Sequence, residues 1–131
     1  MSATLFVYDG NLAGHRRNEQ RLEFTSGSIT VRELIKARIH AEVARYNEKR
    51  AEYFTGLIQP TAALMSLNGW RMQERRVVDA EAQCLAAIRA FEAKEIFVLL
   101  RKTLLGTLDD VVELKDDPQV TFIRMAQVVA G

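Results

Sequence analysis

The chain offers few side chains that could carry out covalent chemistry. Its only cysteine is Cys84, and its only histidines are His15 and His40. A catalytic triad needs a base and an orienting acid beside the nucleophile, and neither histidine has an evident acidic partner in the sequence. Cys84 falls on the apolar side of an expected helix, so we interpret it as a buried and unreactive thiol. The residue inventory therefore predicts a protein that is not an enzyme.

Sites for metals, cofactors and phosphates are equally poorly represented. One cysteine excludes a multi-cysteine metal site, and the two histidines lack an acidic partner with which to build a zinc site. Residues 10–14 (GNLAG) have the glycines of a phosphate-binding loop, but they lack the Gly-Lys-Ser/Thr ending and are followed by an expected strand. We expect no metal and no cofactor.

Length and composition indicate one soluble domain over residues 1–131. The chain is 48% hydrophobic, and its 18 basic and 17 acidic residues give a net charge of +1. This near-neutral balance argues against a strongly cationic nucleic-acid binder. The N-terminus has no basic leader, and no apolar run approaches the ~20 residues of a membrane span. We expect a cytoplasmic protein that binds neither nucleic acid nor membrane.

Short apolar and alternating runs predict strands near both ends of the chain. The expected strands, in chain order, lie at residues 3–9, 21–25, 95–100, 103–105 and 120–125. The first two form an antiparallel hairpin in this interpretation, with residues 10–20 as the loop between them. Residues 107–114 read as a single helical turn with Leu108, Val111 and Val112 pointing inward.

A long helix is predicted at residues 31–50. Thr30 can act as its N-cap, and Glu33, three residues later, completes a capping box. Apolar residues then recur at spacings of three or four, which commits one face of the helix to a core. His40 and Glu42 flank that face, and we interpret both as solvated.

Residues 48–94, which we call the insertion, lie between this helix and the third strand. We expect a short helical turn near residues 61–67 and a second helix from the N-cap Asp79 to Glu92. The insertion contains more large apolar residues than are needed to cover a small sheet. The five are Phe54, Leu57, Ile58, Met65 and Trp70. Two interpretations stay open, because these residues either pack internally or form a surface for self-association or a partner.

The order of these elements, together with three local segments, resembles the β-grasp fold of ubiquitin and its relatives. Residues 28–35 (SITVRELI) resemble the capped start of the ubiquitin-like helix, and residues 105–110 (LGTLDD) resemble the segment before the last strand. Residues 125–131 (MAQVVAG) resemble the glycine-ended tails of ubiquitin-like modifiers and sulfur carriers. The resemblance covers residues 1–47 and 95–131. It implies an α+β fold with a mixed sheet packed on one main helix.

The resemblance also implies a role for the tail, residues 126–131. In this family an E1-like enzyme uses ATP to activate the carboxylate of the last glycine, here Gly131, for transfer to a thiol, an acceptor or sulfur. Val128 and Val129 would let the tail dock as an extended strand in the enzyme's cleft. The implied partners are the E1-like enzyme, an E2-like enzyme and a deconjugating peptidase. The expected function is that of a ubiquitin-like protein modifier from a prokaryotic pathway.

One departure from the family pattern keeps alternatives open. Ubiquitin and the sulfur carriers usually end in two glycines, whereas Ala130 precedes Gly131 here. The first alternative is a binding or assembly module with an inert tail, which self-associates or binds partners through the insertion. The second is a sulfur carrier that forms a thiocarboxylate at its C-terminus.

Overall fold

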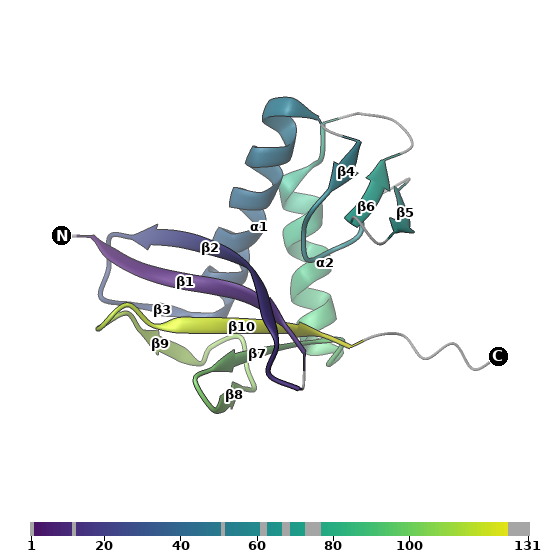
Figure 1. Ribbon diagram of the computed structural model, residues 1–131. Helices are drawn as coiled ribbons and strands as arrows, with labels where there is room; N and C mark the ends of the chain where they lie inside the picture. Colours follow the sequence, from purple (N-terminus) through teal and green to yellow (C-terminus); the bar gives the residue numbers. More distant parts are fainter. Residues whose placement is uncertain are drawn as a thin grey trace. The chain divides into compact units, whose positions relative to one another are not determined.

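The computed structural model is an α+β protein with two long helices (Figure 1). It describes residues 2–11, 13–50, 52–60, 63–66, 69–72 and 77–125, with only the backbone of residues 64–66. The chain divides into two compact units. Unit 1 comprises Met1–Leu34 and Ala90–Gly131, and unit 2 comprises Ile35–Arg89. No helix in the described part of the chain is both long enough and apolar enough to cross a membrane.

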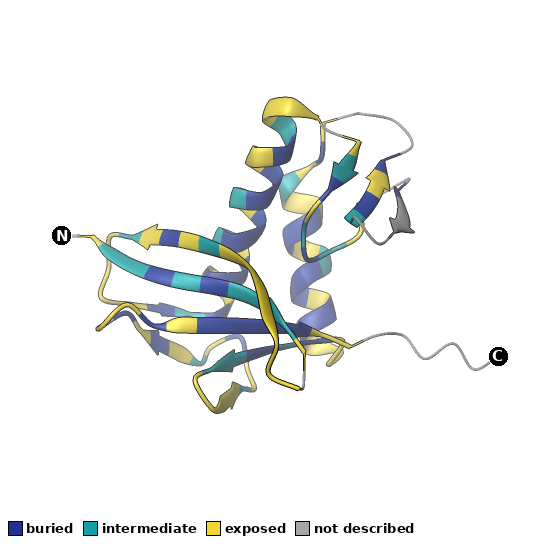
Figure 2. Cartoon of the chain, in the orientation of Figure 1, coloured by how far each residue is buried: buried dark blue, intermediate teal, exposed yellow. Residues whose placement is uncertain are grey.

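Unit 1 is built on a five-stranded mixed sheet with the order β2-β1-β10-β7-β8. Its strands are β1 (Ala3–Gly10), β2 (Arg16–Phe24), β7 (Ile96–Leu100), β8 (Thr103–Leu105) and β10 (Gln119–Arg124). β1 and β10 lie parallel, and every other neighbouring pair is antiparallel. Figure 2 shows the burial that follows from this order: β10 is buried along most of its length, while the edge strands β2 and β8 are largely exposed.

One face of the sheet carries the core of unit 1. The strands contribute Leu5, Val7, Val98, Val120 and Phe122, all at most 1% exposed. Val31 and Leu34, in the first turn of α1 (Val31–Lys49), are fully buried as well. A separate two-stranded pair, β3 (Ser28–Thr30) and β9 (Val111–Glu113), buries Ile29 and Val112.

The N-cap predicted at Thr30 is confirmed, but the Glu33 carboxylate accepts from the Thr30 hydroxyl, whereas in a capping box it accepts from the N-cap N–H. The Thr30 hydroxyl oxygen accepts the backbone N–H of Glu33 at 3.2 Å, and the hydroxyl donates to Glu33 Oε1 at the same distance. Backbone N–H groups of Val31 and Arg32 donate to the carbonyls of Asp110 and Leu108. The loop before β9 therefore satisfies two N–H groups that a helix start leaves without intrahelical partners.

Two expectations for unit 1 were wrong. β2 begins at Arg16 and not at residue 21, because a register shift opposite Val7 and Asp9 interrupts the hydrophobic alternation while strand pairing continues. Asn18 lies near this shift with a φ of 57°, a left-handed conformation that asparagine tolerates well. Residues 111–113 form the strand β9 instead of a helical turn, so Val111 is exposed, while Leu108 and Val112 are buried as predicted.

Unit 2 contains most of α1, the greater part of α2 (Ala80–Glu92) and a small sheet with the order β4-β6-β5. The strands are β4 (Tyr53–Phe54), β5 (Ala63–Ser66) and β6 (Gly69–Met72), all antiparallel. Asp79 caps α2 as predicted, since its Oδ1 accepts the N–H groups of Glu81 and Ala82 at 3.0 and 3.4 Å.

The helical turn expected near residues 61–67 was wrong, because residues 63–66 are the strand β5. Gly69 begins β6 with a φ of 118°, a conformation that other residues rarely adopt. A Cβ at Gly69 would also lie 2.9 Å from the Phe54 carbonyl oxygen on the neighbouring strand β4. Glycine at position 69 therefore permits this close pairing of β6 with β4.

Candidate interaction surface

The sheet of unit 1 has a second face, opposite its core, that we call the outer face. The strand register aligns Leu104, Leu99, Thr121 and Tyr8 in one row across β8, β7, β10 and β1. A second row pairs Phe97 with Ile123. Because side chains alternate along a strand, these residues lie on the side away from Val98, Val120 and Val7.

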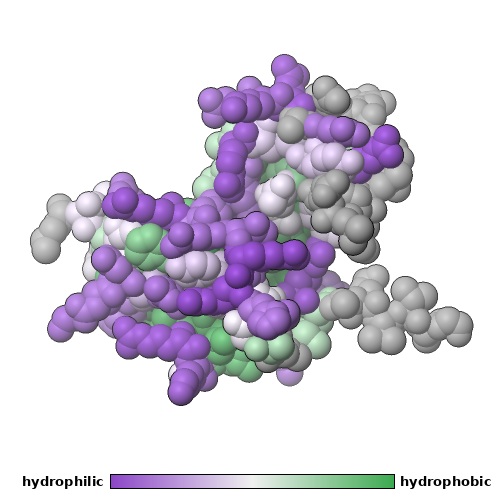
Figure 3. Space-filling model, viewed as in Figure 1, coloured by the Kyte–Doolittle hydropathy of each residue, from purple (hydrophilic) through white to green (hydrophobic). Residues whose placement is uncertain are grey.

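The outer face is apolar toward β8. Leu104 is 57% exposed, Phe97 and Leu99 are half-buried, and Thr121 and Ile123 are buried. Figure 3 shows hydrophobic side chains gathered over the region of β7 and β8, with hydrophilic ones over β2. Exposed apolar groups that adjoin one another in this way are typical of interaction sites.

The same face becomes polar toward β2. The Arg16 guanidinium lies 4.4 Å from the centroid of the Tyr8 ring and donates to Gln119 Oε1 at 2.8 Å. The Tyr8 hydroxyl donates to Glu19 Oε1 at 2.8 Å, and this bond to a carboxylate raises the pKa of Tyr8. The outer face therefore combines an apolar half with a half in which charged side chains are held in place.

Three of the five insertion residues considered for a partner surface are buried. Phe54, Leu57 and Trp70 are each at most 6% exposed, so they belong to the interior of unit 2. The Phe54 ring meets Tyr46 edge-on at 5.4 Å, and Trp70 Nε1 donates to the Gly56 carbonyl at 3.2 Å. Ile58 is half-buried, and the side chain of Met65 lies outside the described residues. Internal packing, one of the two interpretations left open, accounts for the three buried residues.

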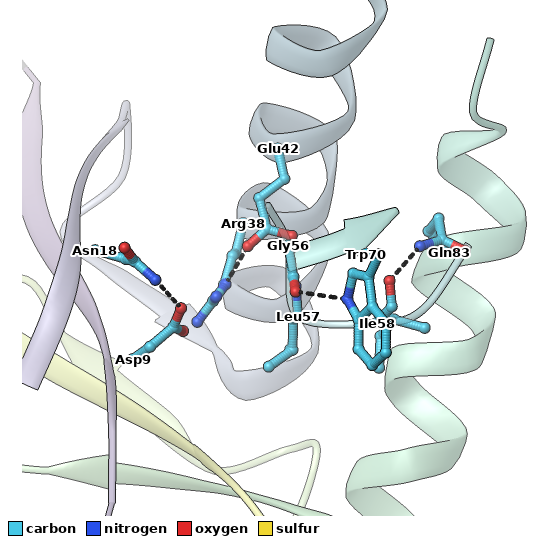
Figure 4. A network of polar contacts seen from close by, with 9 residues as sticks. All are labelled: Asp9, Asn18, Arg38, Glu42, Gly56, Leu57, Ile58, Trp70 and Gln83. Atoms are coloured by element: carbon cyan, nitrogen blue, oxygen red, sulfur yellow. Dashed lines mark hydrogen bonds and ion pairs between the residues drawn. The ribbon is translucent and has the colours of Figure 1, made fainter. Parts of the chain in front are cut away.

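Glu42 is buried, which overturns the expectation that it is solvated. Its Oε1 accepts from Arg38 Nε at 2.6 Å, and its Oε2 accepts from the backbone N–H of Leu57 at 3.0 Å (Figure 4). Glu42 and Arg38 are four residues apart and so share one side of α1. That spacing, beside the buried Ile39 and Val43, was the available sequence signal. The pair fastens the segment after β4 to the helix.

The other residues singled out for chemistry are placed apart. Cys84 is buried as predicted, and burial raises the pKa of its thiol. His40 Nε2 lies 3.3 Å from Glu81 Oε1, which joins α1 to α2 at an exposed position, and His15 is exposed on the other unit. Within the described ranges, no three His, Cys, Asp or Glu side chains are grouped closely enough to bind a metal ion.

The described chain ends just after the central strand β10. The N–H of Met125 donates to the carbonyl of Glu95 at 2.9 Å, which ties the end of the strand to the start of β7. The predicted activation residues, Ala130 and Gly131, and the predicted docking residues, Val128 and Val129, lie outside the described residues. Comparison of the chain with protein-family models, with curated proteins and with solved structures gave no match.

Proposed function

We propose that unit 1 is a β-grasp domain of the ubiquitin-like kind. The support is its strand order, β2-β1-β10-β7-β8, with the first and last strands parallel at the centre and α1 following the first hairpin and β3. A mixed sheet arranged in this way beside one main helix is the architecture of the β-grasp. In this proposal the insertion, residues 48–94, is an elaboration of the segment between that helix and the third strand of the sheet, β7.

We further propose that the protein is a ubiquitin-like modifier activated at Gly131. The observation that carries this is the position of β10, because the segment 126–131 continues directly from a strand at the centre of the sheet. In the first step, the carboxylate of Gly131 attacks the α-phosphorus of ATP, forming an acyl-adenylate and releasing pyrophosphate. A thiol of the activating enzyme then displaces AMP and forms a thioester. A glycine lacks a Cβ, which leaves its carbonyl carbon open to this attack.

Activation is tested with a purified E1-like activating enzyme. The chain ending at Gly131 is incubated with that enzyme and ATP, and its intact mass is measured. The proposal expects an adenylate or a thioester with the wild-type chain and neither with a chain lacking Gly131. Equal product from both chains contradicts it. A product in which sulfur replaces one oxygen of the carboxylate identifies a sulfur carrier instead.

A second candidate function is a binding module that uses the outer face and not the tail. The observation in its favour is the exposed Leu104 beside half-buried Leu99 and Phe97. A Leu104→Ser variant should fold with nearly wild-type stability, since the side chain is exposed, but should lose partner proteins captured from lysate by the wild type. Lys102→Ser, an exposed change at the adjacent turn, is the matched control. Retention of the same partners by Leu104→Ser contradicts this candidate.

A further inference from the structure

The edge of β2 that does not pair with β1 is a second feature of unit 1 to which another chain could bind. β2 is the terminal strand of the sheet, and in the part of the chain that the structure describes no strand pairs with its other side (Figure 1). An edge strand presents backbone N–H and C=O groups that can pair with another chain. Charged side chains often prevent natural edge strands from pairing with other chains. The pattern of charge along β2 therefore determines which strand can pair with it.

The regular part of this edge runs from residue 20 to residue 24. Near Asn18 the register between β1 and β2 shifts, and a bulge of this kind bends and twists a strand away from simple pairing. Beyond it, residues 20–24 pair with β1 without interruption. A second strand can therefore pair regularly with β2 over these few residues only.

The charged residues on that edge of one copy can pair with those on the same edge of a second copy. Arg21 and Glu23 pair with Phe6 and Thr4 of β1, so both lie on the outer face. Arg21 Nη2 lies 3.1 Å from Glu23 Oε1 of the same chain, and the two side chains are 63% and 59% exposed, so they remain accessible to a second copy. When a second β2 strand is placed antiparallel about Leu22, Arg21 of each copy lies opposite Glu23 of the other. Opposite charges at directly facing positions stabilise a strand pair, and like charges destabilise it.

The remaining positions of the same register are compatible with contact. Leu22 faces Leu22 of the second copy, and Gln20 faces Phe24 of the second copy. Leu22, Gln20 and Phe24 lie on the core face of the sheet, where Leu22 is buried and the other two are half-buried. No like-charged residues oppose one another among these positions, so the pairing leaves no uncompensated charge.

We propose that two copies of the chain associate through their β2 edges, antiparallel and symmetric about Leu22, to form one continuous sheet. The contact is the same surface on both copies, so it closes after two copies and does not propagate. The proposal goes beyond the function suggested above, because it uses neither the tail nor the insertion. It places self-association on β2, whereas the sequence had suggested the insertion.

The test is the molar mass in solution of the full chain and its charge-reversed variants. Analytical ultracentrifugation at low salt and at about 100 μM protein should give a dimer for the wild type. Arg21→Glu and Glu23→Arg each turn two attractive cross-strand pairs into repulsive ones, so each should weaken dimerisation at least about tenfold. Lys102→Glu, at the turn next to the opposite sheet edge, is the matched charge reversal and should leave the dimer intact. Circular dichroism confirms that each variant is folded.

The double variant Arg21→Glu with Glu23→Arg separates pairing from a general effect of charge. It restores opposite charges across the two-fold axis while keeping the wild-type net charge, and it should dimerise again. In the wild type, hydrogen exchange of the β2 amides should slow as protein concentration rises. A monomeric wild type, a dimer unaffected by the single reversals, or a double variant that stays monomeric while folded would each overturn the proposal.

Discussion

At the scale of single residues, close packing of the backbone decides which positions accept a side chain. Gly10 ends β1 and pairs with both Arg16 and Ile123. A Cβ there would overlap Thr121 Cγ2 and lie 3.0 Å from the carbonyl oxygen of His15. Thr121 is buried and β-branched, so it has little freedom to move aside. Gly10 therefore allows the first hairpin to close against β10.

Gly10→Ala is expected to lower the free energy of unfolding by about 1–3 kcal/mol, the usual cost of forcing extra volume into a packed site. Urea unfolding followed by circular dichroism measures the change. Gly27→Ala is the matched control, because a Cβ at Gly27 meets nothing within 4 Å. If the two variants are equally stable, the close approach at Gly10 has no energetic consequence.

Asp110 makes the stability of unit 1 depend on pH. Its carboxylate accepts the backbone N–H and the hydroxyl of Thr107 and the backbone N–H of Gly106, at 2.8–3.0 Å. These bonds favour the charged form and lower the pKa of Asp110. A depressed carboxyl pKa in the folded state stabilises the protein above the unfolded pKa. That contribution is lost as pH falls through the folded pKa.

The prediction is that Asp110→Asn is less stable than the wild type at pH 7 and that the difference shrinks below about pH 4, near the ordinary pKa of aspartate. Unfolding midpoints in urea at several pH values give the comparison. Asp109→Asn makes the same change of net charge one residue away and serves as the control. A difference between wild type and Asp110→Asn that stays constant down to acid pH would show that these hydrogen bonds do not favour the charged carboxylate.

Removal of the Glu42 carboxylate should destabilise the protein severely. Glu42→Ala leaves the Arg38 guanidinium buried without this carboxylate and removes the acceptor of the Leu57 N–H. Breaking a buried ion pair from one side typically costs about 3–5 kcal/mol. Glu48→Ala, at an exposed position of the same helix, should change stability by less than about 0.5 kcal/mol. Thermal or urea unfolding that shows similar losses for both variants would contradict the role assigned to Glu42.

At the scale of elements, the sequence predicted the elements that local residues determine better than those that depend on pairing with distant residues. The N-caps Thr30 and Asp79 and the periodic apolar residues that follow fixed both helices closely. β9 and the hairpin of β5 and β6 were missed for a physical reason. Residues 111–113 become a strand by pairing with β3, far away in the sequence, and residues 63–66 do so by pairing with β6. Period alone cannot separate short helical turns from such strands.

The N-cap at Thr30 should make a measurable contribution to the stability of α1. Thr30→Ala removes the acceptor of the Glu33 N–H, so α1 should lose about 1 kcal/mol of stabilisation. Ser28→Ala, an exposed change two residues earlier, is the control and should be close to neutral. Equal unfolding free energies for Thr30→Ala and the wild type would mean that the bonds from α1 to Asp110 and Leu108 carry the helix start without the cap.

At the scale of the whole molecule, the sequence predicted the class of fold and which ends of the chain build the sheet, but not the surfaces. Leu104 and Val111 gave no signal as exposed residues, since apolar runs read the same whether a strand lies at the centre or at an edge of a sheet. Phe54 and Trp70 suggested a surface because the small sheet that buries them could not be foreseen. The position of a strand in its sheet depends on pairing with residues distant in the sequence. That position determines whether such apolar residues are exposed or buried.

The covalent transfer of Gly131 to other proteins, which we propose, can be tested in cells. An N-terminally tagged chain ending at Gly131 is produced in cells of its source organism, purified under denaturing conditions and digested for mass spectrometry. The account predicts peptides in which the Gly131 carboxyl is linked to an acceptor amine, and their loss when Gly131 is deleted. Gly27→Ala should keep them. A tagged chain recovered only with a free C-terminus, under conditions in which the protein is folded and expressed, would contradict the account.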